Sequence, residues 1–331
     1  MSQPLLDVRG LRTVFETRAG TVCAVDGVDV SVQRGECLGI VGESGSGKSV
    51  TFASVMGLVK SPGRIEAGTI LLDGCDLRGL TPKQMRAVRG KDIAMTMQDA
   101  LTALNPALTV GEQIAEVFDA HDDTLPRRGA ARARAIRDKS AEMLGLVGIP
   151  SAESRLRQYP HEFSGGMRQR IMIAIALACR PKLLIADEPT TALDVTIQAQ
   201  VLELITEIRA RLGMSVVLIT HDLGVVAEHC DRVMVMYAGQ VVEEGPTAEV
   251  IAQPQHPYTR GLLASIPRPA LRGQPIQPIE GQVPDLIGLP PQCRFYSRCP
   301  LHRDACLAPV AMRSAGPNRR VRCILSGEPV E

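Results

Sequence analysis

The feature that most constrains this chain is an eight-residue segment beginning at Gly42, which reads GESGSGKS. It matches the pattern G-x-x-x-x-G-K-[ST], follows the apolar run Cys37–Val41 and precedes the helix-compatible run Val50–Val59. Glycines let such a loop curl so that consecutive N–H groups point inward, and the start of a helix adds partial positive charge. The sequence therefore predicts a strand, a loop and a helix that together bind a chain of phosphates.

The side chains of this loop are predicted to hold ATP and Mg²⁺. Lys48 would reach the β- and γ-phosphates as a point charge, while the Ser49 hydroxyl would ligate the metal ion. An ordinary glycine-rich turn is the alternative, which the flanking strand and helix disfavour. The predicted ATP-binding residues of the loop are Gly42, Glu43, Ser44, Gly45, Ser46, Gly47, Lys48 and Ser49.

A second part of the site is expected where another buried strand ends. The apolar run Leu183–Ala186 is followed directly by Asp187 and Glu188. Asp187 would hold Mg²⁺, directly or through water. Glu188 would act as the general base, because phosphoryl transfer depends on a water positioned in line with the leaving group. A helix N-cap is the alternative role for these acids.

A third motif distinguishes this chain from other proteins with a phosphate-binding loop. Residues Phe163–Gln169 read FSGGMRQ, which resembles the signature motif of ABC-transporter ATPases. Further elements follow in the order of that family. Gln98 resembles its Q-loop glutamine, Thr191–Asp194 its D-loop, and His221 its switch histidine.

The resemblance implies an ATP-hydrolysing enzyme in which two nucleotide domains pack head to tail, so that the signature of one closes over ATP held by the other. A serine and two glycines that open a helix also make an anion site on physical grounds. The residues implied to act in trans are Ser164, Gly165, Gly166 and Gln169, with Asp194 in the D-loop. The implied catalytic residues are Glu188, His221 and Gln98, and the implied Mg²⁺ ligands are Ser49, Gln98 and Asp187. Phe15 resembles the aromatic residue that stacks on adenine, with inward packing as its alternative.

Within the ABC proteins, the chain is most similar to the ATP-binding subunits of oligopeptide/dipeptide and nickel importers. The segments Gly39–Val50, Gln98–Pro106 and His256–Leu263 carry this likeness, although Ala100 replaces the usual proline. The likeness implies a motor subunit for peptide import at the cytoplasmic face of the membrane. Its implied partners are a second, paralogous ABC ATPase, two membrane permease subunits and an external solute-binding protein. Import of nickel or another small solute, or a non-transport ABC ATPase, are the alternatives.

The composition agrees with such a subunit. A formal net charge of +1 argues against nucleic acid as a partner, and no apolar run is long enough to cross a bilayer. We expect an α/β fold of the P-loop NTPase, ABC ATPase type, with an antiparallel β subdomain and a helical subdomain at about 99–165. The basic run Arg127–Lys139 is expected to be a solvated helix face. The nucleotide-binding domain is predicted to span 1–260.

A small extension is predicted at 261–331, because 13 of the 23 prolines lie between Pro254 and Pro329. This segment contains four cysteines but few apolar side chains, so burial alone cannot offset the conformational entropy that is lost when the segment becomes ordered. We therefore expect a metal to cross-link it. Four thiolates suit zinc or an iron–sulfur cluster. The passage Cys293–Pro300 resembles an importer extension that in some members carries a [4Fe–4S] cluster, which we favour over zinc or unligated thiols. The predicted ligands are Cys293, Cys299, Cys306 and Cys323.

Overall fold

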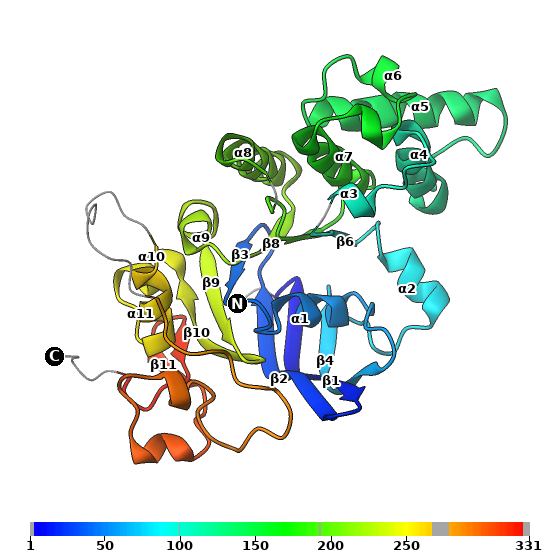
Figure 1. The fold of residues 1–331 in the computed structure, drawn as a ribbon. Coiled ribbons are helices and arrows are strands. Elements are labelled where there is room, and N and C mark those ends of the chain that lie inside the picture. Colours follow the sequence, from blue (N-terminus) through cyan, green and yellow to red (C-terminus); the bar gives the residue numbers. More distant parts are fainter. Residues whose placement is uncertain (1–2, 99, 192, 267–277, 327–331) are drawn as a thin grey trace. The chain divides into compact units, whose positions relative to one another are not determined.

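The computed structural model describes residues 3–98, 100–191, 193–266 and 278–326 (Figure 1). It divides into two compact units. The first comprises residues 1–78 and 218–331, and the second comprises residues 79–217. In the described part of the chain, no helix is both long and apolar enough to span a membrane.

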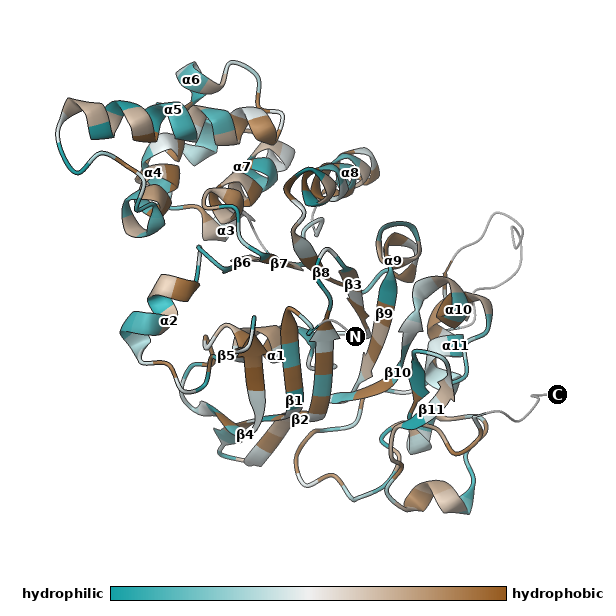
Figure 2. Ribbon diagram, turned by 180° about the vertical axis from the view of Figure 1, so that it is seen from behind, coloured by the Kyte–Doolittle hydropathy of each residue, from teal (hydrophilic) through white to brown (hydrophobic). Residues whose placement is uncertain are grey.

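The first unit contains a four-stranded antiparallel sheet in the order β2-β1-β4-β5. Its strands are β1 (Leu6–Thr17), β2 (Gly20–Val32), β4 (Gly63–Leu72) and β5 (Cys75–Asp76). Leu6 pairs with Val32 and Thr17 with Gly20, so β1 and β2 form one long hairpin. Hydrophilic and hydrophobic residues alternate along both strands, as expected for a sheet with one buried face (Figure 2). This sheet is the predicted antiparallel β subdomain.

A second sheet of the first unit carries the phosphate-binding loop, and its strands lie in the order β11-β12-β10-β9-β3. They are β3 (Cys37–Val41), β9 (Arg232–Tyr237), β10 (Gln240–Pro246), β11 (Arg313–Gly316) and β12 (Arg319–Val321). Strand β3 pairs in parallel with β9, and every residue of β3 is buried. The helices of this unit are α1 (Lys48–Val55), α9 (Leu223–His229), α10 (Thr247–Ala252) and α11 (Pro257–Ala264).

The predicted extension is built into this second sheet. Strand β12 pairs with β10 through Val321 and Glu243, and the fully buried Glu243 receives a hydrogen bond of 2.7 Å from Arg319. The predicted domain boundary at residue 260 lies inside α11. The residues before and after this boundary belong to the same compact unit. Residues 267–277, which belong to the predicted extension, lie outside the described residues.

The second unit combines a parallel strand pair with helices. Strands β6 (Ile93–Thr96) and β7 (Leu183–Asp187) pair in parallel. The helices are α2 (Pro82–Val88), α3 (Ala100–Ala103), α4 (Val110–His121), α5 (Ala130–Leu146), α6 (Ala152–Arg155), α7 (Gly165–Leu177) and α8 (Val195–Leu212). Four of them lie in the predicted helical subdomain at about 99–165. Strand β8 (Ser215–Thr220) begins in this unit and ends in the first.

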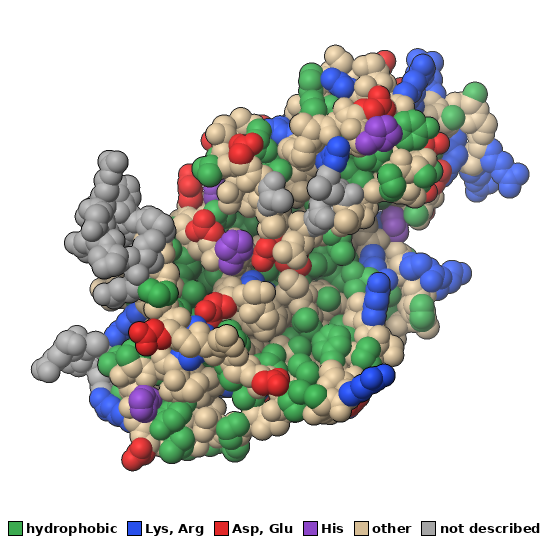
Figure 3. Space-filling view, in the orientation of Figure 1, with side chains coloured by type: hydrophobic (Ala, Val, Ile, Leu, Met, Phe, Trp, Pro, Cys, Tyr) green, Lys and Arg blue, Asp and Glu red, His purple; other side chains and the backbone are tan. Residues whose placement is uncertain are grey.

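Two predicted helices differ in detail from the observed ones. Helix α1 begins at Lys48 and ends at Val55, earlier than the predicted run to residue 59, because Gly57 adopts a positive φ of 60° just beyond the C-cap. The predicted basic face lies on and just before α5. Arg127, Arg128 and Arg134 are exposed there, and Figure 3 shows basic side chains gathered at this end of the helical unit.

Candidate nucleotide site

The phosphate-binding loop joins the end of β3 to the start of α1, and two of its glycines have no room for a side chain. A Cβ atom on Gly42 would lie 2.1 Å from the carbonyl oxygen of Met236, and one on Gly47 would lie 2.5 Å from that of Ala24. Both glycines also have positive φ values, of 155° and 97°. The backbone therefore curls into the shape that presents its N–H groups to an anion.

Lys48 lies at the centre of this loop. Its side chain is buried, and its Nζ donates hydrogen bonds to the carbonyl oxygens of Gly42 at 2.7 Å and Glu43 at 3.0 Å. Ser49, the first residue after it, is exposed at the start of α1. The loop thus combines a fixed cation, a helix N-terminus and an accessible hydroxyl, which are the groups that a nucleoside triphosphate with Mg²⁺ requires.

Residues distant in sequence hold the loop in place. The N–H of Gly239 donates to the carbonyl oxygen of Ser46 at 2.9 Å. The N–H of Glu43 donates to the phenolic oxygen of Tyr258 at 2.8 Å. The Glu43 carboxylate forms an ion pair with Arg298, whose side chain is only 3% exposed. Sequence analysis did not assign Tyr258 or Arg298 to the site, because no local spacing indicates contacts across more than 200 residues.

Phe15 lies in the same unit as the loop, on β1. It is paired with Val22 on one side and with Gly63 on the other. Its ring is half-buried and lies against Gly63, where an added Cβ would be 2.5 Å from the ring. One part of the ring thus packs against the protein. The stacking of adenine on Phe15 stays a prediction.

The second unit brings two of the predicted catalytic residues together. Asp187 is the last residue of β7 and is buried, and Glu188 follows it. One carboxylate oxygen of Glu188 accepts hydrogen bonds from Nε2 of Gln98 at 3.0 Å and from Oγ1 of Thr191 at 2.8 Å. Glu188 has a φ of 45°, a left-handed conformation that costs a side-chain-bearing residue about 1–3 kcal/mol and is typical of functional sites.

The signature residues form an open anion site at the start of α7. Ser164 is its N-cap and accepts a hydrogen bond of 3.4 Å from the N–H of Met167. Both Ser164 and Gly165 are exposed. Gly166 packs closely on α8, because a Cβ there would lie 2.6 Å from a methyl group of Ile197. The exposed N-terminus of α7 is therefore a candidate anion site.

The remaining predicted residues are placed as follows. Gln169 lies on the buried side of α7 with 3% exposure, and within the described part of the chain its Nε2 has no hydrogen-bond partner. Its role in trans stays a prediction. Asp194 is exposed and caps α8 by accepting a hydrogen bond of 2.9 Å from the N–H of Ile197. His221 is exposed directly after β8, in the first unit.

The comparison with known families identifies this combination of loops. Residues 25–191 match the family model described as ABC transporter. The chain belongs to the ABC transporter family. Residues 242–306 match a second model, described as the C-terminal region of oligopeptide/dipeptide transporters. This ABC protein is therefore an ATPase whose hydrolysis of ATP is coupled to transport.

The relatives and solved structures agree with this membership. The dipeptide transport ATP-binding protein of Bacillus subtilis is 53% identical, over 92% of this chain and 89% of its own length. The oligopeptide transport ATP-binding protein of Salmonella typhimurium is 46% identical, over 99% and 94%. A dimeric ATP-binding cassette bound to ADP and Pi has 26% identity and a TM-score of 0.64, over 73% of this chain and 98% of that one.

The four cysteines of this ABC subunit's extension converge on one small cavity of about 10 Å³. Burial raises the pKa of the Cys299 thiol to about 11, and the neighbouring thiols Cys293, Cys323 and Cys306 act in the same direction. In the described residues, no group of three or more His, Cys, Asp or Glu side chains is arranged to hold a metal ion. The donor chemistry fits a four-thiolate group, but the thiols do not form a ready coordination sphere.

Proposed function

We propose that this chain is the motor subunit of a membrane importer for peptides, acting at the cytoplasmic face. The observation that carries the proposal is that one chain has a complete phosphate-binding loop and a signature helix with an exposed N-terminus, together with an extension that matches that of peptide transporters. The relatives named for dipeptide and oligopeptide transport support peptides over nickel as the cargo. We also propose that residues 1–260 form the nucleotide-binding domain and residues 261–331 the extension typical of peptide transporters.

Each group of the site has a proposed task. The loop residues Gly42 to Ser49 bind the phosphates, and Phe15 binds adenine. The oxygen donors of Ser49, Gln98 and Asp187 are the ligand type that Mg²⁺ prefers, and the ion would offset the charge of the phosphates. Glu188 takes a proton from the attacking water and Gln98 orients this carboxylate, consistent with their 3.0 Å hydrogen bond. His221 contacts the γ-phosphate.

The second half of each site is proposed to come from another subunit. Ser164 and Gly165 are exposed at a helix N-terminus, which suits them to close over a γ-phosphate held elsewhere. ATP would favour this closed pair and ADP would not, so hydrolysis would reopen it. We propose a paralogous ABC ATPase as the partner, with two permease subunits and an external solute-binding protein.

The extension is proposed to carry a [4Fe–4S] cluster on Cys293, Cys299, Cys306 and Cys323. Four thiols around one cavity are the donor set for such a cluster, and Sγ of Cys323 accepts a hydrogen bond of 3.4 Å from the N–H of Leu325. The sulfurs would have to move apart around it. Anaerobic purification tests this assignment. Visible absorbance with equal amounts of iron and acid-labile sulfide is expected, whereas colourless protein with one bound zinc would overturn it.

Affinity purification of the tagged chain from its native membranes in mild detergent tests the importer. Mass spectrometry is expected to identify two permease subunits, a second ATPase and a solute-binding protein. Uptake of labelled di- and oligopeptides by the reconstituted complex, with Ni²⁺ as the comparison, identifies the cargo. Recovery with DNA-repair or ribosomal proteins, and without permeases, would contradict the transport role.

A further inference from the structure

The short loop between Cys293 and Cys299 reaches the phosphate-binding loop through Arg298. The guanidinium group and the Glu43 carboxylate meet as a fork, with Nη1 2.6 Å from Oε2 and Nη2 3.0 Å from Oε1. The guanidinium also donates to the carbonyl oxygens of Glu280 at 2.8 Å and Ile279 at 3.2 Å, and to the phenolic oxygen of Tyr237 at 3.3 Å. The arginine side chain is 3% exposed and the glutamate side chain 30%. Such a two-point, largely desolvated pair is a strong charge interaction with a fixed geometry.

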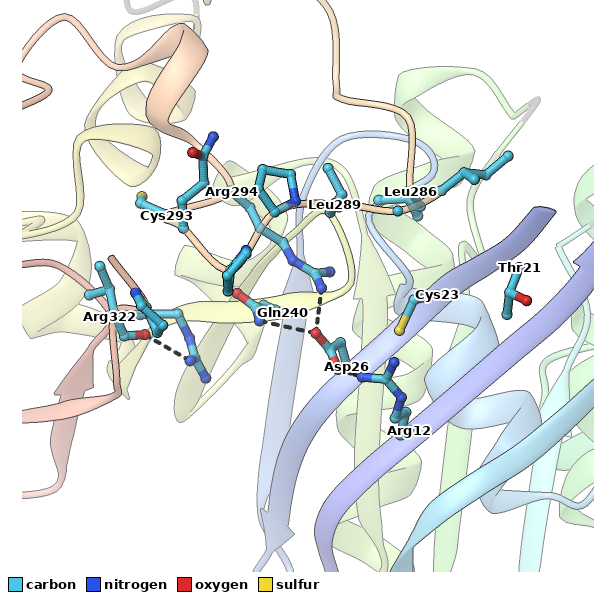
Figure 4. Close-up of a pocket in the computed structure, with 17 residues that line it drawn as sticks. Arg12, Thr21, Cys23, Asp26, Gln240, Leu286, Leu289, Cys293, Arg294 and Arg322 are labelled. Carbon is cyan, nitrogen blue, oxygen red and sulfur yellow. Dashed lines mark hydrogen bonds and ion pairs between the residues drawn. The ribbon is translucent and has the colours of Figure 1, made fainter. Parts of the chain in front are cut away.

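A second arginine of the same loop supports the turn beneath the phosphate-binding loop. Arg294 donates to the carbonyl oxygen of Ala238 and to the carboxylate of Asp26, and Figure 4 shows its side chain pointing at this carboxylate. The next residue, Gly239, donates its N–H to Ser46 in the phosphate-binding loop. The extension therefore contacts the phosphate-binding loop directly and also holds the turn on which it rests.

Glu43 presents an electrostatic problem in this position. A loop that binds phosphates gains affinity from inward N–H groups and a lysine, whereas a carboxylate within the same loop repels an anionic ligand. The partly buried position of Glu43 weakens solvent screening of that repulsion. A permanently charged guanidinium paired with the carboxylate removes the net charge and at the same time fixes the start of the loop.

We propose that Arg298 is a positioning residue of the nucleotide site, which neutralises Glu43 and holds the phosphate-binding loop in its ligand-ready shape. The C-terminal extension is then a working part of the ATP site and not only an appendage of the cassette. This inference goes beyond the roles proposed above and does not depend on the cargo, or on what the four thiols bind.

Equilibrium binding of fluorescent ATP and ADP analogues to the full chain tests it. Arg298→Gln is expected to weaken ATP binding about tenfold, as for the loss of one partner of a desolvated pair. ADP binding should weaken less, because ATP carries one more negative charge. The double variant Glu43→Gln, Arg298→Gln is expected to return to within about threefold of the wild-type affinity, because it has no unpaired carboxylate.

Two further variants separate charge compensation from folding. Glu43→Gln alone should bind ATP more tightly than the wild type, because the charge of Arg298 is then uncompensated beside the phosphates while the amide oxygen of the glutamine can still accept its hydrogen bond. This variant keeps the inference testable if Arg298→Gln does not fold. Arg313→Gln makes the same charge change at an exposed residue of β11 and should leave both affinities unchanged. A double variant as weak as Arg298→Gln, or a Glu43→Gln chain with tenfold weaker ATP binding, would overturn the proposal.

Discussion

The helix N-termini at Lys48 and Gly165 are the two that the sequence motifs mark as anion sites, and they are supported very differently. At the start of α1, the phosphate-binding loop follows β3 and is held by Gly239, by Tyr258 and by Arg298. At the start of α7, Ser164 and Gly165 are exposed. The phosphate-binding loop is therefore held in one shape without a ligand, whereas the start of α7 is an exposed surface. This difference supports our proposal that the phosphate-binding loop holds the chain's own nucleotide and that the start of α7 acts on a nucleotide bound by another subunit.

The largest loss of ATP hydrolysis is expected from substitution of Glu188, which lies in the same unit as α7. Glu188→Gln keeps the size of the side chain but removes the base, so turnover should fall by about 10²–10⁴-fold. Binding of a fluorescent ATP analogue should persist, because the phosphate-binding loop is untouched. Phosphate release and equilibrium binding measure the two quantities. Hydrolysis at the wild-type rate would remove Glu188 from the role of base.

The two signature glycines allow a matched test of the open site. A Cβ on Gly165 would be 3.8 Å from the nearest side-chain atom outside its local chain, so Gly165→Ala should fold normally. Its methyl group would obstruct the anion site, and hydrolysis should fall by about 10²-fold, the range for loss of one transition-state donor. ATP binding by the same chain should be unchanged, since we propose that this glycine acts in trans.

Gly166→Ala provides the contrast, because its Cβ would lie 2.6 Å from Ile197. We expect a lower melting temperature in addition to lost hydrolysis, as for other overpacked contacts. Melting curves measured by circular dichroism distinguish the two variants. If Gly165→Ala weakened ATP binding as much as hydrolysis, the signature would belong to the chain's own nucleotide site and the contrast between the two helix N-termini would fail.

A smaller effect on ATP binding is expected from replacing one of the proposed cluster ligands of the extension. Cys293→Ser should abolish the visible absorbance of the cluster proposed above and loosen the segment that carries Arg294 and Arg298. The Michaelis constant for ATP should therefore rise several-fold, about 1 kcal/mol in binding, with kcat nearly unchanged. The exposed Cys75 provides the control, since Cys75→Ser should change neither quantity. An unchanged Michaelis constant in a cluster-free Cys293→Ser chain would show that the extension supports the loop without a metal.

The smallest effect is expected at Tyr258. Tyr258→Phe removes the acceptor for the N–H of Glu43 and leaves the ring contacts with Tyr237 and Phe295 in place. One hydrogen bond contributes about 0.5 kcal/mol at the low end of its usual net range, because water can replace the lost acceptor, so ATP affinity should fall about twofold. Isothermal titration calorimetry measures the change. An unaltered affinity would mean that the other contacts of the loop suffice.

Local patterns were enough to predict most of the cassette. The apolar run Cys37–Val41 predicted β3 with the observed bounds, and β7 extends one residue beyond the run Leu183–Ala186, to Asp187. The motifs also assigned Gln98 and Glu188 to one site, and the structure places them in hydrogen-bond contact. They could not predict that Glu43 meets Arg298, because that pair depends on the register with which the extension joins β10. Nor could motif likeness show that Gln169 is buried on α7, since a short motif does not specify which face of the helix packs.

The central claim is that the open signature site closes on ATP held by a second subunit. The most direct test is the accessibility of residue 164 in the purified transporter carrying Glu188→Gln and Ser164→Cys. Maleimide labelling at that position is read by peptide mass spectrometry, with ATP or with ADP. We expect strong protection with ATP, full labelling with ADP, and full labelling of the isolated chain in both cases. Equal labelling of the transporter with either nucleotide would contradict the account.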